Sequence, residues 1–103
     1  MSRIEQIQAM LADMPGDNFL THALALEYIK AGLAGKALEC FNANLENNPD
    51  YVATYYHLGK LHEQSGRTNE AIRTYEQGME KAKNQGDIHS YNELRNVYEM
   101  LIY

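Results

Sequence analysis

The fold is decided by residues 18–51, NFLTHALALEYIKAGLAGKALECFNANLENNPDY, because residues 52–85, VATYYHLGKLHEQSGRTNEAIRTYEQGMEKAKNQ, repeat the same pattern 34 positions later. The superposition pairs identical residues at Leu24/Leu58, Gly32/Gly66, Ala37/Ala71 and Glu46/Glu80. It pairs similar residues at Ala25/Gly59, Leu38/Ile72, Phe41/Tyr75 and Leu45/Met79. The two prolines, Pro15 and Pro49, are also 34 positions apart. A fixed period of this length is typical of stacked structural repeats.

Apolar residues within each stretch recur at steps of three and four, and no run alternates for long enough to predict a strand. Gly32 and Gly66 divide each stretch into two helices, since glycine readily adopts the left-handed backbone that ends a helix. Residues 2–14 predict a further helix, which begins at the capping-box pair Ser2 and Glu5. Residues 87–102 predict a closing helix capped by Asp87.

These residues resemble the tetratricopeptide repeat family, whose unit is a 34-residue helix–turn–helix. The resemblance implies a small stand-alone member with an all-α fold, a right-handed α-α superhelix of five or six antiparallel helices. It implies a single domain over 1–103, made of a half-repeat helix (2–14), repeat one (18–51), repeat two (52–85) and the closing helix (87–102). The chain departs from the family pattern at Thr21, Asn44, His62 and Lys83.

Charge and composition exclude several classes of function. The 103 residues carry 9 basic and 14 acidic side chains, a net charge of −5, which opposes nucleic-acid binding. The apolar runs are too short for a membrane helix, and the amino terminus lacks the apolar run of a signal peptide, so we expect a cytoplasmic protein without membrane contact. Cys40 is the single cysteine and cannot form an intramolecular disulfide.

Templates for catalysis also fail, so we expect no enzyme, no metal and no cofactor. His57 and His62 are five residues apart and point to different sides of a helix. His62 and Glu63 begin a zinc-protease motif, but Gly66 stands where its second histidine is required.

The resemblance implies a non-catalytic interaction module, in which the first helices of successive repeats line a concave surface that binds a peptide or helix of a partner protein. The partner-binding side chains expected there are Phe19, His22, Leu26, Ile29, Tyr56, Lys60, Glu63, His89, Asn92 and Asn96. The Lys, Arg and Asn clamp with which one subclass of the family binds acidic peptide tails is absent. Phe19, Leu26 and Ile29 either form an exposed apolar patch or are covered within the monomer.

The alternative is a structural homodimer. In this interpretation the apolar stripe of the first repeat, or the terminal run Met100-Leu101-Ile102-Tyr103, is used for self-association. In a short array the two uncovered end faces are a large part of the structure, and few interfaces between repeats offset them. A dimer would bury additional apolar area.

Overall fold

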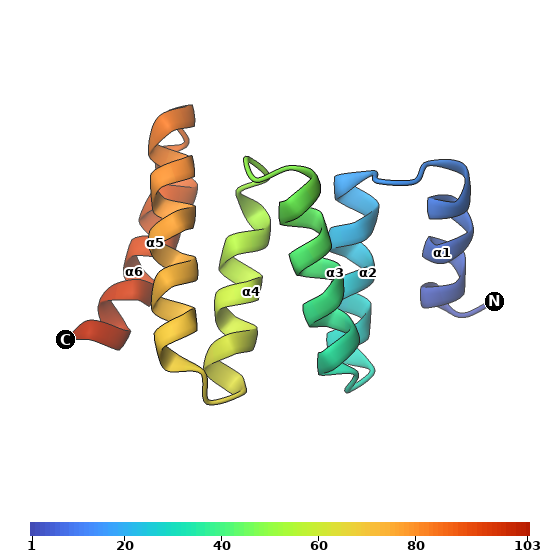
Figure 1. Cartoon of the computed structure of the whole chain (residues 1–103), viewed down its shortest axis with the longest axis horizontal. Helices are drawn as coiled ribbons and strands as arrows, with labels where there is room; N and C mark the ends of the chain where they lie inside the picture. Colours follow the sequence, from blue (N-terminus) through green and yellow to red (C-terminus); the bar gives the residue numbers. More distant parts are fainter. The chain divides into compact units, whose positions relative to one another are not determined.

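The computed structural model describes residues 1–103 and contains six α-helices and no strand, which confirms the all-α prediction (Figure 1). The helices are α1 (Arg3–Asp13), α2 (Asn18–Lys30), α3 (Ala34–Asn47), α4 (Ala53–Gln64), α5 (Thr68–Gln85) and α6 (Ile88–Ile102). They form two compact units, unit 1 over Met1–Tyr51 and unit 2 over Val52–Tyr103. The boundary between the units coincides with the predicted boundary between repeats one and two.

Each unit is a set of three packed helices. In unit 1, α2 packs against both α1 and α3. In unit 2, α5 packs against α4 and α6, and α4 also contacts α6. Because α2 and α3, and likewise α4 and α5, are joined by a short turn, each pair runs antiparallel (Figure 1).

The predicted helix starts are confirmed. The Ser2 hydroxyl accepts a hydrogen bond from the Glu5 backbone amide at 3.1 Å, and the Glu5 carboxylate accepts one from the Ser2 amide at 3.0 Å. The hydrogen bond from the Ser2 amide to the carboxylate lowers the pKa of Glu5, and the Ser2 side chain lowers it further, since both favour the charged form. At α6, the Asp87 carboxylate accepts from the Ser90 amide at 3.1 Å.

The predicted helix ends are confirmed as well. Gly32 and Gly66 both have a φ of +76°, in the left-handed region that other residues avoid. Directly after each glycine, a backbone amide returns to the preceding helix. Leu33 donates to the Tyr28 carbonyl and Arg67 to the His62 carbonyl, each at 2.8 Å.

Unit 1 holds α2 against α3 through side-chain amides as well as through apolar packing. Asn44 on α3 is 1% exposed, and its side-chain oxygen Oδ1 accepts a hydrogen bond from Asn18 Nδ2 on α2 at 2.6 Å. Asn44 Nδ2 donates to the Asn18 backbone carbonyl at 3.2 Å. Asn48 Nδ2 donates to Asn18 Oδ1 at 3.3 Å. The departure from the family pattern at Asn44 is therefore a buried polar contact whose hydrogen bonds are satisfied. The buried apolar residues of this unit are Ile7, Leu20, Leu24, Ala25, Tyr28, Ala37 and Phe41.

Unit 2 holds its helices together by placing aromatic side chains against glycines. A Cβ atom at Gly59 of α4 would lie 2.1 Å from Cε1 of Tyr75, so the bare backbone makes room for the ring. A Cβ at Gly78 of α5 would lie 2.6 Å from the Cβ of Tyr55 and 3.0 Å from Cδ1 of Leu94. The two glycines therefore set how closely α5 approaches α4 and α6.

Some apolar side chains that recur at helical spacing are less buried than others on the same helix. Ile72 and Met79 share the helical stripe of Tyr75 but are only half-buried. On α1, Ile7 is fully buried, whereas Met10 is 37% exposed and Leu11 is half-buried. Because α1 is covered by other helices on one side alone, it buries a narrow stripe and has one fully buried side chain.

Candidate functional site

The face of α2 in unit 1 carries four of the predicted partner-binding residues. Phe19 is 69% exposed, whereas Leu26 and Ile29 are half-buried, so of these three large apolar side chains only Phe19 is exposed. The half-buried His22 ring lies between two aromatic rings, 5.7 Å from Phe41 and 5.9 Å from Tyr51 between ring centroids. Unit 1 therefore presents one exposed aromatic side chain on this helix.

Unit 2 contains a hollow of about 320 Å³ between α4 and α6. Its lining residues are Val52, Ala53, Tyr56, His57, Ser90, Glu93 and Leu94. Of the predicted site residues, the structure places Tyr56 in this lining. The Tyr56 and His57 rings meet edge to face with their centroids 5.4 Å apart. The hollow thus combines apolar, aromatic and charged groups from two helices.

Two other predicted residues of α4 contact each other. Lys60 Nζ lies 3.7 Å from a Glu63 carboxylate oxygen. The same carboxylate accepts a hydrogen bond from the Tyr75 hydroxyl of α5. The pKa of Tyr75 is raised strongly by burial and further by this hydrogen bond. Glu63 therefore helps to join α4 to α5, whatever it does toward a ligand.

The predicted residues of α6 lie outside the hollow. His89, Asn92 and Asn96 are exposed and are not among its lining side chains. His89 Nε2 lies 3.5 Å from Glu93 Oε1, so His89 reaches the hollow only through Glu93. The structure brings Tyr56 together with side chains of α6 that the sequence reasoning did not select.

The lining residues that were not predicted are Val52, Ala53, His57, Ser90, Glu93 and Leu94. A signal for two of them was present in the repeat. If α6 is aligned with α4 by the two-residue slip that pairs Leu94 with Leu58, Glu93 falls on the position of His57. Burial lowers the pKa of His57, and the negative charge of Glu93 partly opposes this effect. Two equivalent repeat positions therefore both contribute to the lining of the hollow.

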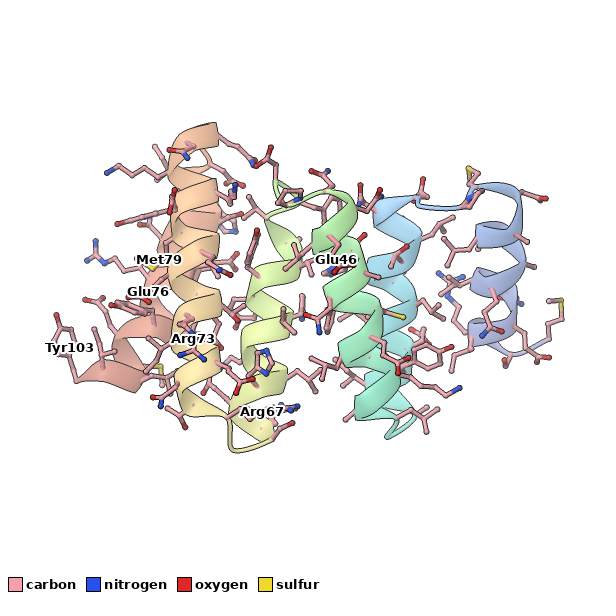
Figure 2. All side chains as sticks on the ribbon, in the orientation of Figure 1. Glu46, Arg67, Arg73, Glu76, Met79 and Tyr103 are labelled. Atoms are coloured by element: carbon pink, nitrogen blue, oxygen red, sulfur yellow. The ribbon has the colours of Figure 1, made fainter.

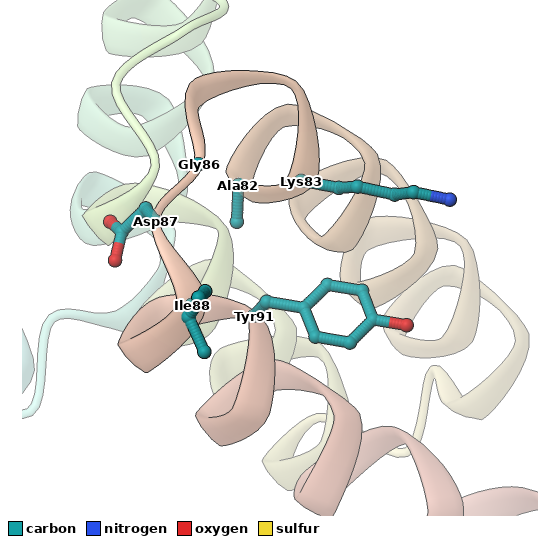
Figure 3. Close-up of a pocket in the computed structure, with 6 residues that line it drawn as sticks. All are labelled: Ala82, Lys83, Gly86, Asp87, Ile88 and Tyr91. Carbon is teal, nitrogen blue, oxygen red and sulfur yellow. The ribbon is translucent and has the colours of Figure 1, made fainter.

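A second hollow of about 280 Å³ lies where α5 ends and α6 begins, and no function was predicted there. Its lining residues are Ala82, Lys83, Gly86, Asp87, Ile88 and Tyr91. Figure 3 shows Ile88 and the Tyr91 ring projecting from the start of α6 near Ala82. Ile88 is 72% exposed, so this end of unit 2 presents apolar surface to solvent.

The groups considered for catalysis are placed as follows. The structure contains no cluster of three or more His, Cys, Asp or Glu side chains suited to a metal ion. Cys40 is half-buried, and burial raises the pKa of its thiol, which favours the unreactive protonated form. None of the six helices combines the length and the apolar character that a membrane span requires.

Comparison with known proteins supports the repeat assignment. The family model described as tetratricopeptide repeat matches residues 28–91. A TPR repeat-containing protein of Pseudomonas aeruginosa is 32% identical over 91 residues, which cover 88% of this chain and 87% of the relative. The solution structure of a tetratricopeptide repeat domain protein from Salinibacter ruber is 45% identical, with a TM-score of 0.82, and the match covers 84% of this chain and 88% of that one. The predicted resemblance and the predicted fold class are both confirmed.

A more distant solved structure has the same fold with a ligand. It is the first TPR of Spaghetti bound to an HSP90 peptide, and it matches with a TM-score of 0.75 at 22% identity. The match covers 97% of this chain and 78% of that one.

Proposed function

Because the chain belongs to the tetratricopeptide repeat family, we propose that it is a non-catalytic module that binds a peptide or helix of a partner protein through the first helix of each repeat. Members of this family are typically interaction modules, and no enzyme is among the similar proteins above. The surfaces proposed are the face of α2 in unit 1 and the faces of α4 and α6 in unit 2.

The observation that carries this proposal is the hollow of about 320 Å³ between α4 and α6, with Tyr56 in its lining. Aromatic side chains in partly enclosed positions contribute much of the free energy of protein association, because they bury a large area at low entropic cost. Phe19 supplies a second, more exposed aromatic group on α2. Tyr56 is the proposed anchor of unit 2 and Phe19 that of unit 1, where the half-buried Leu26 and Ile29 of the same helix add apolar area.

The peptide-bound structure of Spaghetti supports peptide binding by this fold. The side chains of this chain do not match an acidic-tail clamp, because His22, Leu26, Asn92 and Asn96 stand where cationic and amide groups would be needed. We therefore propose a partner segment that is not acidic.

The test is selection of binders from a random dodecapeptide phage library, followed by titration of a selected peptide into ¹⁵N-labelled protein. We expect amide shifts at Tyr56, His57 and Ser90, and a loss of affinity of about tenfold for Tyr56→Ala. Tyr103→Ala is the matched control, because it removes an aromatic side chain that is 92% exposed at the end of α6. Failure to select any peptide, or equal binding by Tyr56→Ala, would refute the proposal.

Self-association is a second candidate, favoured by the apolar side chains exposed on α6 and its end. Met100, Ile102 and Tyr103 of the terminal run are 77%, 40% and 92% exposed, and Figure 2 shows Tyr103 at the tip of this helix. Surfaces of this kind are usually covered by an interaction. Light scattering over a wide concentration range should then show a dimer of wild-type protein and a monomer of Met100→Glu, with Phe19→Glu as the control that stays dimeric. A wild-type monomer at all concentrations excludes this candidate.

A further inference from the structure

The hollow between α4 and α6 contains a single carboxylate. Among its lining residues, Glu93 is the only acidic one, and no lysine or arginine is present. The remaining lining residues are apolar, aromatic or hydroxyl-bearing, apart from His57, whose pKa is lowered by burial. The hollow therefore has one negative charge at neutral pH.

Glu93 is available for a ligand. Its side chain is 56% exposed, and the His89 ring with which it pairs at 3.5 Å is 85% exposed. An exposed pair of this kind contributes little free energy, so a better donor can replace it. A carboxylate also offers two oxygens with about four acceptor positions, of which His89 occupies one.

The basic side chains nearest along these two helices are engaged by other carboxylates. Lys60 of α4 lies 3.7 Å from Glu63, and Arg95 of α6 lies 3.2 Å from Glu99. The whole chain has a net charge of −5, which attracts cationic groups over a longer range. The carboxylate of the hollow is therefore left for a positive charge supplied by a ligand.

The size and the walls of the hollow fit one long side chain. About 320 Å³ lies at the lower end of the range for small-molecule pockets, so it holds a side chain better than a larger ligand. Val52, Ala53 and Leu94 provide apolar surface for a methylene stem. The half-buried Tyr56 ring is part of the lining, and an aromatic ring attracts a cation.

We propose that this hollow binds a basic side chain of the partner segment, arginine in preference to lysine, with its cationic group at Glu93 and Tyr56. Arginine is preferred because its planar guanidinium group can stack on an aromatic ring while it donates two hydrogen bonds to one carboxylate. This inference rests on the proposed function and adds to it the chemistry of the ligand. It predicts that a basic residue is the central feature of the bound segment.

The test uses a small probe, so that it does not depend on peptide selection. N-acetyl-arginine amide and its neutral isostere N-acetyl-citrulline amide are titrated into ¹⁵N-labelled protein. We expect the arginine probe to shift the amide signals of Tyr56, His57 and Ser90, and the citrulline probe to bind about tenfold more weakly because it lacks the charge. Equal shifts with both probes would overturn the inference.

Two variants locate the charge. Glu93→Gln should weaken the arginine probe about tenfold and leave the citrulline probe unchanged, since the amide keeps the shape of the side chain and removes its charge. Glu80→Gln is the matched control, because Glu80 is exposed on α5, outside the lining of the hollow. An unchanged affinity in Glu93→Gln, with thermal unfolding like that of wild type, would overturn the inference.

The phage selection and the arginine probe together separate this inference from the proposed function. If phage selection yields peptides that bind at Tyr56 but contain no basic residue, the ligand chemistry is wrong and the binding function stands. If selection yields no peptide while the arginine probe still binds at Glu93, the hollow is assigned correctly and the peptide-binding function is wrong.

Discussion

Units 1 and 2 follow the same 34-residue period, but they bring their helices together with different side chains. Asn44 and Gly78 occupy equivalent positions, 34 residues apart. In unit 1, Asn44 is buried and hydrogen-bonded to Asn18 of α2. In unit 2, Gly78 leaves room for Tyr55 and Leu94. The comparison shows that a repeat position determines where two helices come into contact. The contact itself can be made either by hydrogen bonds or by close packing.

The two units also differ at two further equivalent positions whose side chains contact each other in unit 2. Phe41 and Ile29 of unit 1 correspond to Tyr75 and Glu63 of unit 2. The hydroxyl that distinguishes tyrosine from phenylalanine donates to the carboxylate that has replaced isoleucine. Unit 2 therefore gains a donor and its acceptor together, which avoids an unsatisfied polar group in a partly buried place.

We expect the largest change in the free energy of unfolding where the packing of unit 2 requires a glycine. Gly59→Ala would place a methyl group 2.1 Å from Cε1 of the fully buried Tyr75. Because the ring is enclosed, we expect a loss of about 3 kcal/mol in the free energy of unfolding, measured by urea denaturation. Gly35→Ala in unit 1 is the control, since a Cβ there meets nothing within 4 Å and alanine favours the helix. A Gly59→Ala variant as stable as wild type would show that the ring moves freely.

The amide contact of unit 1 gives the next effect. Asn44→Ala would remove two hydrogen bonds and leave the polar groups of Asn18 without this neighbour. We expect a loss of about 2 kcal/mol in the free energy of unfolding, because buried polar groups are costly to leave unsatisfied. Asn42→Ala on the same helix is the control, as Asn42 is exposed. Equal stability of the two variants would mean that the amide network contributes nothing.

The positions of these contacts could be predicted from the sequence, but their chemistry could not. Periodicity located the paired helices, the glycine ends of α2 and α4, and buried positions such as Leu24, Leu58 and Tyr75. The resemblance to the family marked Asn44 as a departure without indicating Asn18, because a hydrogen-bond partner 26 residues away depends on tertiary packing. Period alone also does not indicate which side of α6 faces α4. The predicted residues His89, Asn92 and Asn96 are exposed and lie outside the hollow, whereas Glu93 lines it.

A smaller effect tests whether Tyr75 and Glu63 act as a pair. Tyr75→Phe removes the hydroxyl donor and should cost about 1.5 kcal/mol, as expected for a hydrogen bond to a charged group. The double variant Tyr75→Phe/Glu63→Ile reproduces the combination found in unit 1 and should recover part of that loss. Urea denaturation of the wild type, both single variants and the double variant gives the coupling free energy. Strictly additive losses would contradict a direct interaction.

The last prediction concerns acid, and it depends on the position at which unit 1 has Tyr28 and unit 2 has His62. The Tyr28 hydroxyl accepts a hydrogen bond from Gln8 Nε2 at 3.1 Å. His62 Nδ1 is buried without a hydrogen bond, and the nearest carboxylate oxygen, from Glu70, lies 3.9 Å away. Burial lowers the pKa of His62 below its ordinary value of 6.5, and the charge of Glu70 only partly offsets this effect. The folded chain therefore holds this proton less tightly than the unfolded chain does.

The sign of the pH effect follows from that difference. Above the unfolded pKa of about 6.5, His62 is neutral in both states and costs nothing. As the pH falls through 6.5 toward the lowered folded pKa, the unfolded chain takes up the proton first, so the folded state loses relative stability. Urea midpoints at pH 7.5, 6.5 and 5.5 should fall more steeply for wild type than for His62→Gln, while the exposed His89→Gln should keep the wild-type slope. If the urea midpoint of His62→Gln falls as steeply with pH as that of wild type, then Glu70 compensates the charge of the buried imidazolium. Unit 2 then tolerates acid at this position as well as unit 1 does with tyrosine.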